Sequence, residues 1–130
     1  MQGGCFCGFV RYQAEGRPFD LTNCHCSICR RCSGAPFVPW FSVMMVDFRF
    51  TAGQPTTIRS SDHGTRGFCP TCGTPLTFAS TQFPDQIDVT ICSLDNPELL
   101  RPQDDTRTSS ALSWVCLDQH LPHFPEARDP

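Results

Sequence analysis

Hydrophobic and polar residues alternate along several short stretches of the chain, which is the pattern of β-strands that bury one face. The alternating and β-rich stretches cover residues 9–14, 18–26, 46–53, 56–61, 75–80 and 86–95. An apolar stretch at 35–42 also predicts a strand. Its prolines indicate an edge or bent strand, because proline lacks the amide proton that a sheet ladder uses.

Helical structure is predicted to be scarce, because no window sustains a repeat of about 3.6 residues. We expect one or two helical turns after Cys29 and a capped turn at 96–100, where Asn96 precedes a proline. Twelve prolines and nine glycines separate the strands, and the composition does not change along the 130 residues. The pattern therefore predicts one mainly β domain of short antiparallel strands, with a polar and loosely attached end from residue 123.

Charge and hydropathy bear on the partners and the compartment. The net charge of −3 argues against nonspecific nucleic-acid binding. The first residues lack the basic and apolar regions of a signal peptide, and the longest apolar stretch, at 37–46, is too short to cross a bilayer. We expect a soluble, cytoplasmic protein with no nucleic-acid or membrane partner. Nothing in the sequence indicates an oligomeric state.

The ten cysteines of the sequence are the candidate metal ligands. In a reducing cytosol, clustered cysteines indicate metal binding rather than disulfides. The motif Cys-Pro-Thr-Cys-Gly, from Cys69 to Gly73, is typical of a zinc knuckle. It places two thiolates on one tight turn, and the glycine lets backbone amides point at the sulfur atoms. Because tetrahedral zinc needs four ligands, another pair must come from elsewhere.

Two groups could complete the knuckle, and spacing alone does not choose between them. Cys5 and Cys7 form one, and Cys24, Cys26 and Cys29 form the other. Adding Cys5 and Cys7 to the knuckle would give a closed four-thiolate site, as in structural zinc sites, with iron as the main rival metal. The remaining three thiolates would then leave one position open, as in catalytic zinc sites.

The order of these motifs resembles the glutathione-dependent formaldehyde-activating enzyme family, which is also represented in centromere protein V. The resemblance rests on GGCFCGFVRY, CHCSICRRCSGA, FCPTCGTPL and SLDNP, and it covers the chain from Gly3 to about Pro125. It implies a zinc-binding β fold like that of methionine-R-sulfoxide reductases, at residues 1–125, followed by a loose tail at 126–130. This sequence departs from the family in its additional Cys32 and in Asp105, where relatives often carry histidine.

The resemblance also implies the ligand sets and an activity. It assigns Cys5, Cys7, Cys69 and Cys72 to a structural zinc, and it assigns Cys24, Cys26 and Cys29 to a second zinc beside a glutathione-binding cleft. The implied activity is that of a carbon–sulfur lyase acting on thiol adducts of small carbonyl compounds, of the glutathione plus formaldehyde type. The alternative is a non-enzymatic zinc-stabilised binding module, in which Cys32 closes the second site. An empty or oxidised thiol cluster is a third reading.

Several residues near these motifs carry separate expectations. Arg30 and Arg31 could clamp the carboxylates of a glutathione-like peptide, or they could form a solvated basic turn. His25 lies between two candidate ligands, and we expect it to pack in the interior or support the metal ligands. Buried positions are predicted for Cys92, Cys116, Trp40, Phe41 and Trp114.

Overall fold

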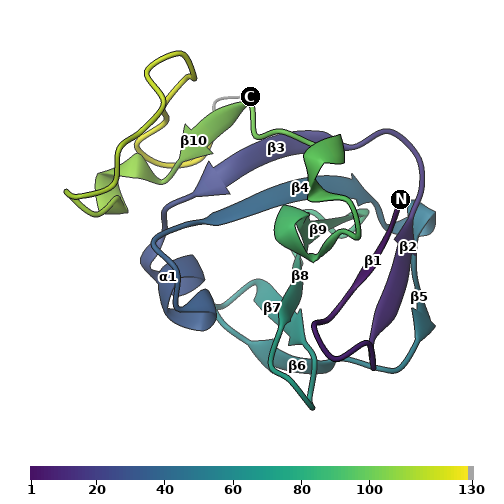
Figure 1. The fold of residues 1–130 in the computed structure, drawn as a ribbon. Helices are drawn as coiled ribbons and strands as arrows, with labels where there is room; N and C mark the ends of the chain where they lie inside the picture. Colours follow the sequence, from purple (N-terminus) through teal and green to yellow (C-terminus); the bar gives the residue numbers. More distant parts are fainter. Residues whose placement is uncertain (129–130) are drawn as a thin grey trace.

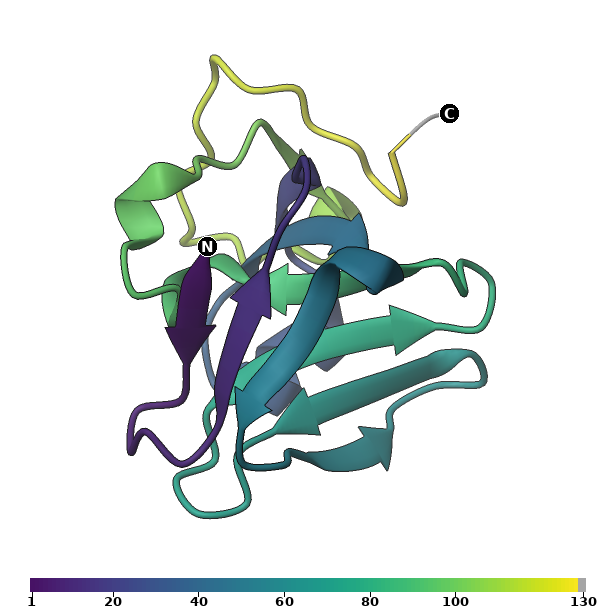
Figure 2. The same cartoon turned by 90° about the vertical axis from the view of Figure 1, so that its right-hand side faces the viewer.

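The strands of the computed structural model, which describes residues 1–128, form two sheets (Figures 1 and 2). The large sheet has the order β10-β3-β4-β9-β8-β7-β6, and the small sheet has the order β1-β2-β5. The strands are Gln2–Gly4 (β1), Arg11–Ala14 (β2), Phe19–Cys24 (β3), Val38–Met44 (β4), Phe48–Ala52 (β5), Thr56–Arg59 (β6), Gly64–Phe68 (β7), Pro75–Ser80 (β8), Gln86–Thr90 (β9) and Asp104–Thr106 (β10). All pairings are antiparallel except that of β10 with β3. The predicted mainly β domain is confirmed.

Helices are short. The only α-helix among the described residues is Ser27–Ser33 (α1), and single 3-10 turns lie at Met45–Asp47, Ile91–Ser93, Pro97–Leu99 and Thr108–Ser110. The turn at Pro97–Leu99 confirms the predicted cap, because Asn96 Oδ1 accepts a hydrogen bond from the amide of Glu98 at 3.3 Å. No helix within residues 1–128 is long and apolar enough to cross a membrane.

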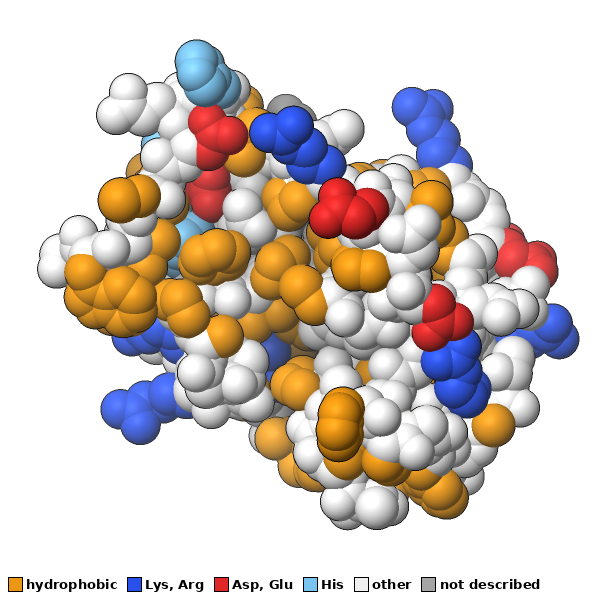
Figure 3. Space-filling model, viewed as in Figure 1, with side chains coloured by type: hydrophobic (Ala, Val, Ile, Leu, Met, Phe, Trp, Pro, Cys, Tyr) orange, Lys and Arg blue, Asp and Glu red, His pale blue; other side chains and the backbone are white. Residues whose placement is uncertain are grey.

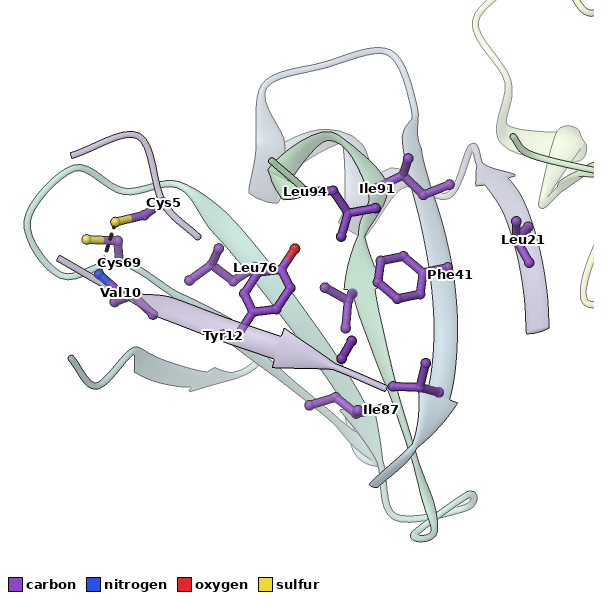
Figure 4. Packing of buried hydrophobic residues seen from close by; sticks show 13 residues of the cluster. Cys5, Val10, Tyr12, Leu21, Phe41, Cys69, Leu76, Ile87, Ile91 and Leu94 are labelled. Carbon is purple, nitrogen blue, oxygen red and sulfur yellow. Dashed lines mark hydrogen bonds between the residues drawn. The ribbon is translucent and has the colours of Figure 1, made fainter. Parts of the chain in front are cut away.

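The main hydrophobic core lies between the two sheets, whose strands cross at a steep angle in Figure 2. Figure 4 shows Tyr12 of β2 facing Phe41 of β4 and Leu76 of β8. The Tyr12 hydroxyl bonds to Ser93 Oγ at 2.8 Å, and burial raises the pKa of this phenol to about 12. This buried contact couples the small sheet to the turn that follows β9.

The large sheet uses its two faces differently because successive side chains point to opposite sides. In β4, Phe41 and Val43 enter the core, whereas Trp40 and Ser42 line a cavity on the other face. In β9, Val89 enters the core and Asp88 lines the same cavity. The alternation visible in the sequence thus separates the residues that stabilise the fold from those available to a ligand.

The apolar stretch at 35–42 differs from its prediction, because β4 is an interior strand of the large sheet. The sheet tolerates Pro39 because the β4–β9 ladder begins only at Trp40, so Pro39 pairs with Asn23 of β3 alone. Because β9 has no partner residue at Pro39, the absent amide proton of this proline costs no hydrogen bond between β4 and β9.

Three short strands, β1, β7 and β10, are absent from the pattern-based prediction. In β7, Gly64 and Gly67 lower the local strand propensity. Both are needed for close packing, because a Cβ on Gly64 would lie 2.6 Å from Phe78 Cε2 and one on Gly67 would lie 2.5 Å from Thr77 Oγ1. In β10, the polar Asp-Asp-Thr is held by tertiary contacts rather than by its own propensity: Arg128 forms an ion pair with Asp104, and His25 forms a hydrogen bond with Asp105.

Three residues expected in the interior lie on the surface. Cys92 and Cys116 are exposed, and Trp114 is 69% exposed. The apolar neighbours of Cys92 and Cys116 suggested buried strands, but Cys92 sits in a 3-10 turn and Cys116 follows a turn outside any sheet. Figure 3 shows hydrophobic side chains gathered on the left of this face, around the segment that follows β10. Trp40 and Phe41 are buried as predicted.

The segment expected to form a loose tail makes several contacts as far as Arg128. The Arg128 guanidinium binds Asp104 at 2.6 and 2.8 Å and Asp20 at 2.8 Å. The amide of Arg107 also donates to the carbonyl of Glu126 at 2.9 Å. These contacts hold residues 126–128 against β3 and β10, and the rest of the predicted tail, residues 129–130, lies outside the described residues.

We expect Phe41→Ala to lower the free energy of unfolding by about 3–5 kcal/mol, because the side chain is fully buried in the main core and leaves a cavity. Denaturant unfolding of the metal-loaded protein measures this loss. Phe83→Ala is the matched control: Phe83 is 60% exposed, so the change should stay within about 0.5 kcal/mol. A loss below about 1 kcal/mol for Phe41→Ala would contradict the assigned core.

Candidate metal centres and substrate cavity

The first cysteine cluster joins two turns that are distant in the sequence. Cys5 and Cys7 lie between β1 and β2, and Cys69 and Cys72 lie between β7 and β8. The four sulfur atoms all lie within 4.8 Å of one another, with Cys5 to Cys7 at 3.6 Å and Cys7 to Cys69 at 3.8 Å. Tetrahedral zinc with bonds of about 2.3 Å places its sulfur ligands about 3.8 Å apart. The set therefore fits a closed four-thiolate zinc site.

Backbone amides surround this cluster as they do in zinc knuckles. The amide of Val10 donates to Cys5 Sγ at 3.2 Å (Figure 4), and those of Thr71 and Cys72 donate to Cys69 Sγ at 3.4 and 3.5 Å. Gly73 has φ +80°, the left-handed conformation that the knuckle turn needs. These donors stabilise negative charge on sulfur, which is the form that binds metal.

The second cluster is built at the junction of β3 and α1. Cys24 ends β3, Cys26 caps α1, and Cys29 lies in its first turn. Their sulfur atoms also lie within 4.8 Å of one another, and Cys26 Sγ accepts a hydrogen bond from the amide of Cys29 at 3.2 Å. Hydrogen bonds from the Cys24 and Cys29 thiols, together with this amide, lower the pKa of Cys26 to about 2. The set offers three soft ligands to zinc and leaves a fourth position to another molecule.

Cys32 does not join the second cluster. It is exposed on α1, and the described residues that could hold a metal there are Cys24, Cys26 and Cys29 alone. Cys32 therefore does not supply a fourth metal ligand to the second cluster. This arrangement differs from the one that the binding-module alternative requires.

His25 is fully buried between the two ligands that flank it, as expected for a packed residue. Its Nε2 lies 2.8 Å from Asp105 Oδ1, and its ring packs on Phe37 with the centroids 4.9 Å apart. The amide of His25 also donates to the carbonyl of Thr106 at 3.0 Å. Asp105 thus fastens β10 to the turn that carries the cysteines.

Arg66 of β7 is a functional candidate that the sequence did not reveal. It is only 9% exposed, and its guanidinium lies over the rings of Phe78 and Trp40, 5.0 and 5.9 Å from their centroids. Its Nη2 donates to Cys29 Sγ at 3.5 Å and its Nε to Ser60 Oγ at 3.1 Å.

The charge of Arg66 has an unusual partner. No carboxylate among residues 1–128 forms an ion pair with it. A buried cation needs a nearby anion, and the Cys29 sulfur that Arg66 contacts would supply this charge as a metal-bound thiolate. The sequence signal was an arginine three residues before the knuckle, but nothing local marks it as buried.

A cavity of about 480 Å³ opens beside the second cluster. Cys24, Cys26, Cys29 and Arg66 line it together with Trp40 and Phe78. Charged side chains of both signs complete the wall: Asp20, Asp88 and Glu126 on one hand, and Arg107 and Arg128 on the other. The volume is in the range of small-molecule sites, and the mixed charges suit a ligand that carries both carboxylates and an amine.

Arg30 and Arg31, for which we weighed a ligand clamp against a solvated basic turn, do not line this cavity. They line a separate surface depression with Leu112 and Trp114, and the cavity beside the cysteines does not include them. Arg30 donates to the carbonyl of Ser110 at 2.5 Å. Residues distant in sequence, Arg66, Arg107 and Arg128, supply the arginines of the cavity instead.

Comparisons with known proteins agree with this architecture. The family model described as "Glutathione-dependent formaldehyde-activating enzyme" matches residues 1–110. A Halomonas elongata protein provisionally named as such an enzyme is 26% identical over 110 residues, covering 78% of this chain and 69% of its own. An uncharacterized lyase of Schizosaccharomyces pombe is 32% identical over 80 residues, covering 62% of this chain and 58% of its own. The crystal structure of a Rhodobacter sphaeroides protein matches with a TM-score of 0.66 and 29% identity, over 82% of this chain and 100% of that one.

We expect Cys69→Ser to release the metal of the first cluster and to unfold the domain, because metal binding supplies folding free energy. Metal analysis and thermal unfolding measure the two effects on the purified protein. Cys92→Ser is the matched control, since Cys92 is exposed and lies outside both clusters. Near-wild-type metal content and melting temperature in Cys69→Ser would refute the structural assignment.

A pH-dependent prediction concerns Asp88. Burial raises the pKa of this carboxyl above 3.8, against a hydrogen bond from Ser42 Oγ at 2.6 Å. A raised folded-state pKa contributes stability that is lost as pH rises from 3.8 through that pKa. Asp88→Asn removes this loss, so its unfolding free energy relative to wild type should increase between pH 4 and pH 7.

Asp95→Asn provides the comparison of opposite sign. The Arg11 guanidinium beside Asp95 lowers the pKa of this carboxyl, so the carboxylate contributes stability above pH 3.8 that is lost as pH falls. Asp95→Asn should therefore lose a little stability relative to wild type as pH rises. Denaturant unfolding at several pH values tests both, and parallel trends for the two variants would contradict the assigned environments.

Proposed function

The chain belongs to the glutathione-dependent formaldehyde-activating enzyme family, and from this premise we propose that it catalyses the reversible addition of a thiol such as glutathione to a small carbonyl compound. In the lyase direction the same site would cleave the carbon–sulfur bond of the adduct. The observation that carries the proposal is the three-thiolate cluster, which opens on a cavity with charged walls.

Zinc fits both clusters by donor type and by the spacing of the sulfur atoms. Cys5, Cys7, Cys69 and Cys72 would hold the structural ion, and Cys24, Cys26 and Cys29 would hold the second. At the second cluster a zinc ion supplies Lewis acidity, which favours the thiolate form of a substrate thiol.

The residues of the cavity have distinct tasks in this proposal. Arg107 and Glu126, both exposed at the rim, could bind a carboxylate and the ammonium of a peptide thiol, whereas Arg128 and Asp20 bind one another and keep the rim in place. Trp40 and Phe78 exclude water from the sulfur atoms. Holding thiol and carbonyl together in one geometry supplies much of the rate increase.

The reaction itself conserves oxidation state. The sulfur–carbon bond forms, the carbonyl π bond breaks, and the proton lost by the thiol ends on the oxygen. Negative charge develops on that oxygen. Among residues 1–128, no protein group accepts a hydrogen bond from Nη1 of Arg66. We assign to this N–H group the stabilisation of the developing charge.

The alternative, a binding module with two structural metals, has less support. It requires a fourth ligand at the second cluster, but Cys32 lies outside it. The absence of a cavity beside Cys24 would also have favoured it, whereas one of about 480 Å³ is present.

We expect the zinc-loaded protein to bind glutathione in a calorimetric titration, and Cys26→Ser to weaken the binding at least tenfold. Cys116→Ser is the matched control, because Cys116 is exposed and belongs to neither cysteine cluster. Absence of binding at millimolar glutathione, with two zinc ions per chain confirmed, would refute glutathione as the ligand. Equal binding by wild type and Cys26→Ser would show that the second cysteine cluster does not take part in glutathione binding.

The role of Arg66 has its own readout. NMR exchange spectroscopy measures how fast the hydroxymethyl adduct of glutathione forms and breaks down. Arg66→Lys keeps the charge but loses the planar donor pair, so it should lower the catalysed exchange rate more than the glutathione affinity. An equal loss in both would indicate that Arg66 contributes to binding alone.

A further inference from the structure

A second cavity adjoins the one that contains the three-thiolate cluster. It has a volume of about 320 Å³, and it shares Cys29, Trp40 and Arg66 with the first cavity. The character of its remaining wall differs, because no other charged side chain lines it. Apolar side chains form much of that wall: Val38, Ile58, Phe68 and Pro75.

The size and position of this second cavity distinguish it from a packing defect. Protein interiors have few voids larger than a water molecule, whereas this space could hold several. It is reached from solvent at Ile58, which is 44% exposed on β6. An accessible space with a largely apolar wall is suited to an apolar ligand group.

The two cavities meet at the reacting groups. Cys29 belongs to the thiolate cluster, and Arg66 contacts its sulfur at 3.5 Å. A ligand that places its charged part in the first cavity and an apolar group in the second must therefore pass these residues. A thiol adduct has this shape when the carbonyl carbon, next to sulfur, carries an apolar substituent.

We propose that the second cavity binds the apolar substituent of the carbonyl compound, so that the substrates include aldehydes with an aryl or branched alkyl group. This inference rests on the proposed function and narrows its substrate class. Formaldehyde carries no such group and would leave the cavity unfilled. The chemistry is unchanged: the thiol adds to the aldehyde carbon, and the thiol proton ends on the oxygen.

Two unreactive thioethers test the inference by binding alone. S-benzylglutathione places a phenyl group beside sulfur, and S-methylglutathione does not. Both lack a free thiol, so their comparison isolates the substituent. Calorimetry on the zinc-loaded protein should give about tenfold or more tighter binding for the benzyl compound, since burial of its ring removes apolar surface from water.

The variant Ile58→Trp tests whether the second cavity causes the tighter binding of the benzyl compound. The larger side chain narrows the cavity from an exposed strand position that accepts aromatic residues, so the benzyl-to-methyl affinity ratio should fall towards one. Val46→Trp is the matched control, because Val46 is also β-branched, is 92% exposed and lines neither cavity. Its ratio should equal that of wild type.

The outcomes separate this inference from the function on which it rests. Glutathione binding with equal affinities for the two thioethers would overturn the inference and leave the proposed function intact. A benzyl preference that persists in Ile58→Trp would place the ring elsewhere and also overturn it. Failure of glutathione and both thioethers to bind would overturn the two together.

Discussion

The contact on which the rest of the structure depends is the meeting of four cysteine sulfurs between the two sheets. Cys5 and Cys7 come from the small sheet, and Cys69 and Cys72 come from the large sheet. Four thiolates cannot remain this close without a cation, because their charges repel one another. A metal ion held by these four residues would fix how the sheets cross, and so would fix the core that Tyr12 and its partners fill.

The same constraint extends to the proposed active site through β7. This strand carries Arg66 and ends immediately before Cys69. The position of the buried guanidinium over Trp40 and Phe78 is thus tied to the knuckle three residues away. A structural metal centre can in this way orient a charged group beside the second cluster. The two clusters are separate in chemistry but linked by one short strand.

The cavity takes its shape from four distant parts of the chain, one of which is the β7–β8 pair that carries Arg66 and Phe78. The face of β3, β4 and β9 that points away from the core supplies its floor, and the turn into α1 supplies the sulfur atoms. The segment after β10 supplies its charged rim, held by the ion pairs of Arg128 with Asp104 and Asp20. Asp105 joins this segment to His25.

The sequence by itself determined the mainly β class, most of the strands and the two cysteine groups. Alternation and motif spacing are local properties, so they survive without knowledge of the fold. The sequence left open which pair completes the knuckle, and only the family resemblance chose Cys5 and Cys7. Tertiary structure decided what local patterns cannot. It placed β4 between β3 and β9, which Pro39 permits because the ladder with β9 begins only at Trp40, and it placed Arg30 and Arg31 in a depression outside the cavity. It also decided that Arg66 is buried beside sulfur, because burial depends on strands that pack together from across the chain.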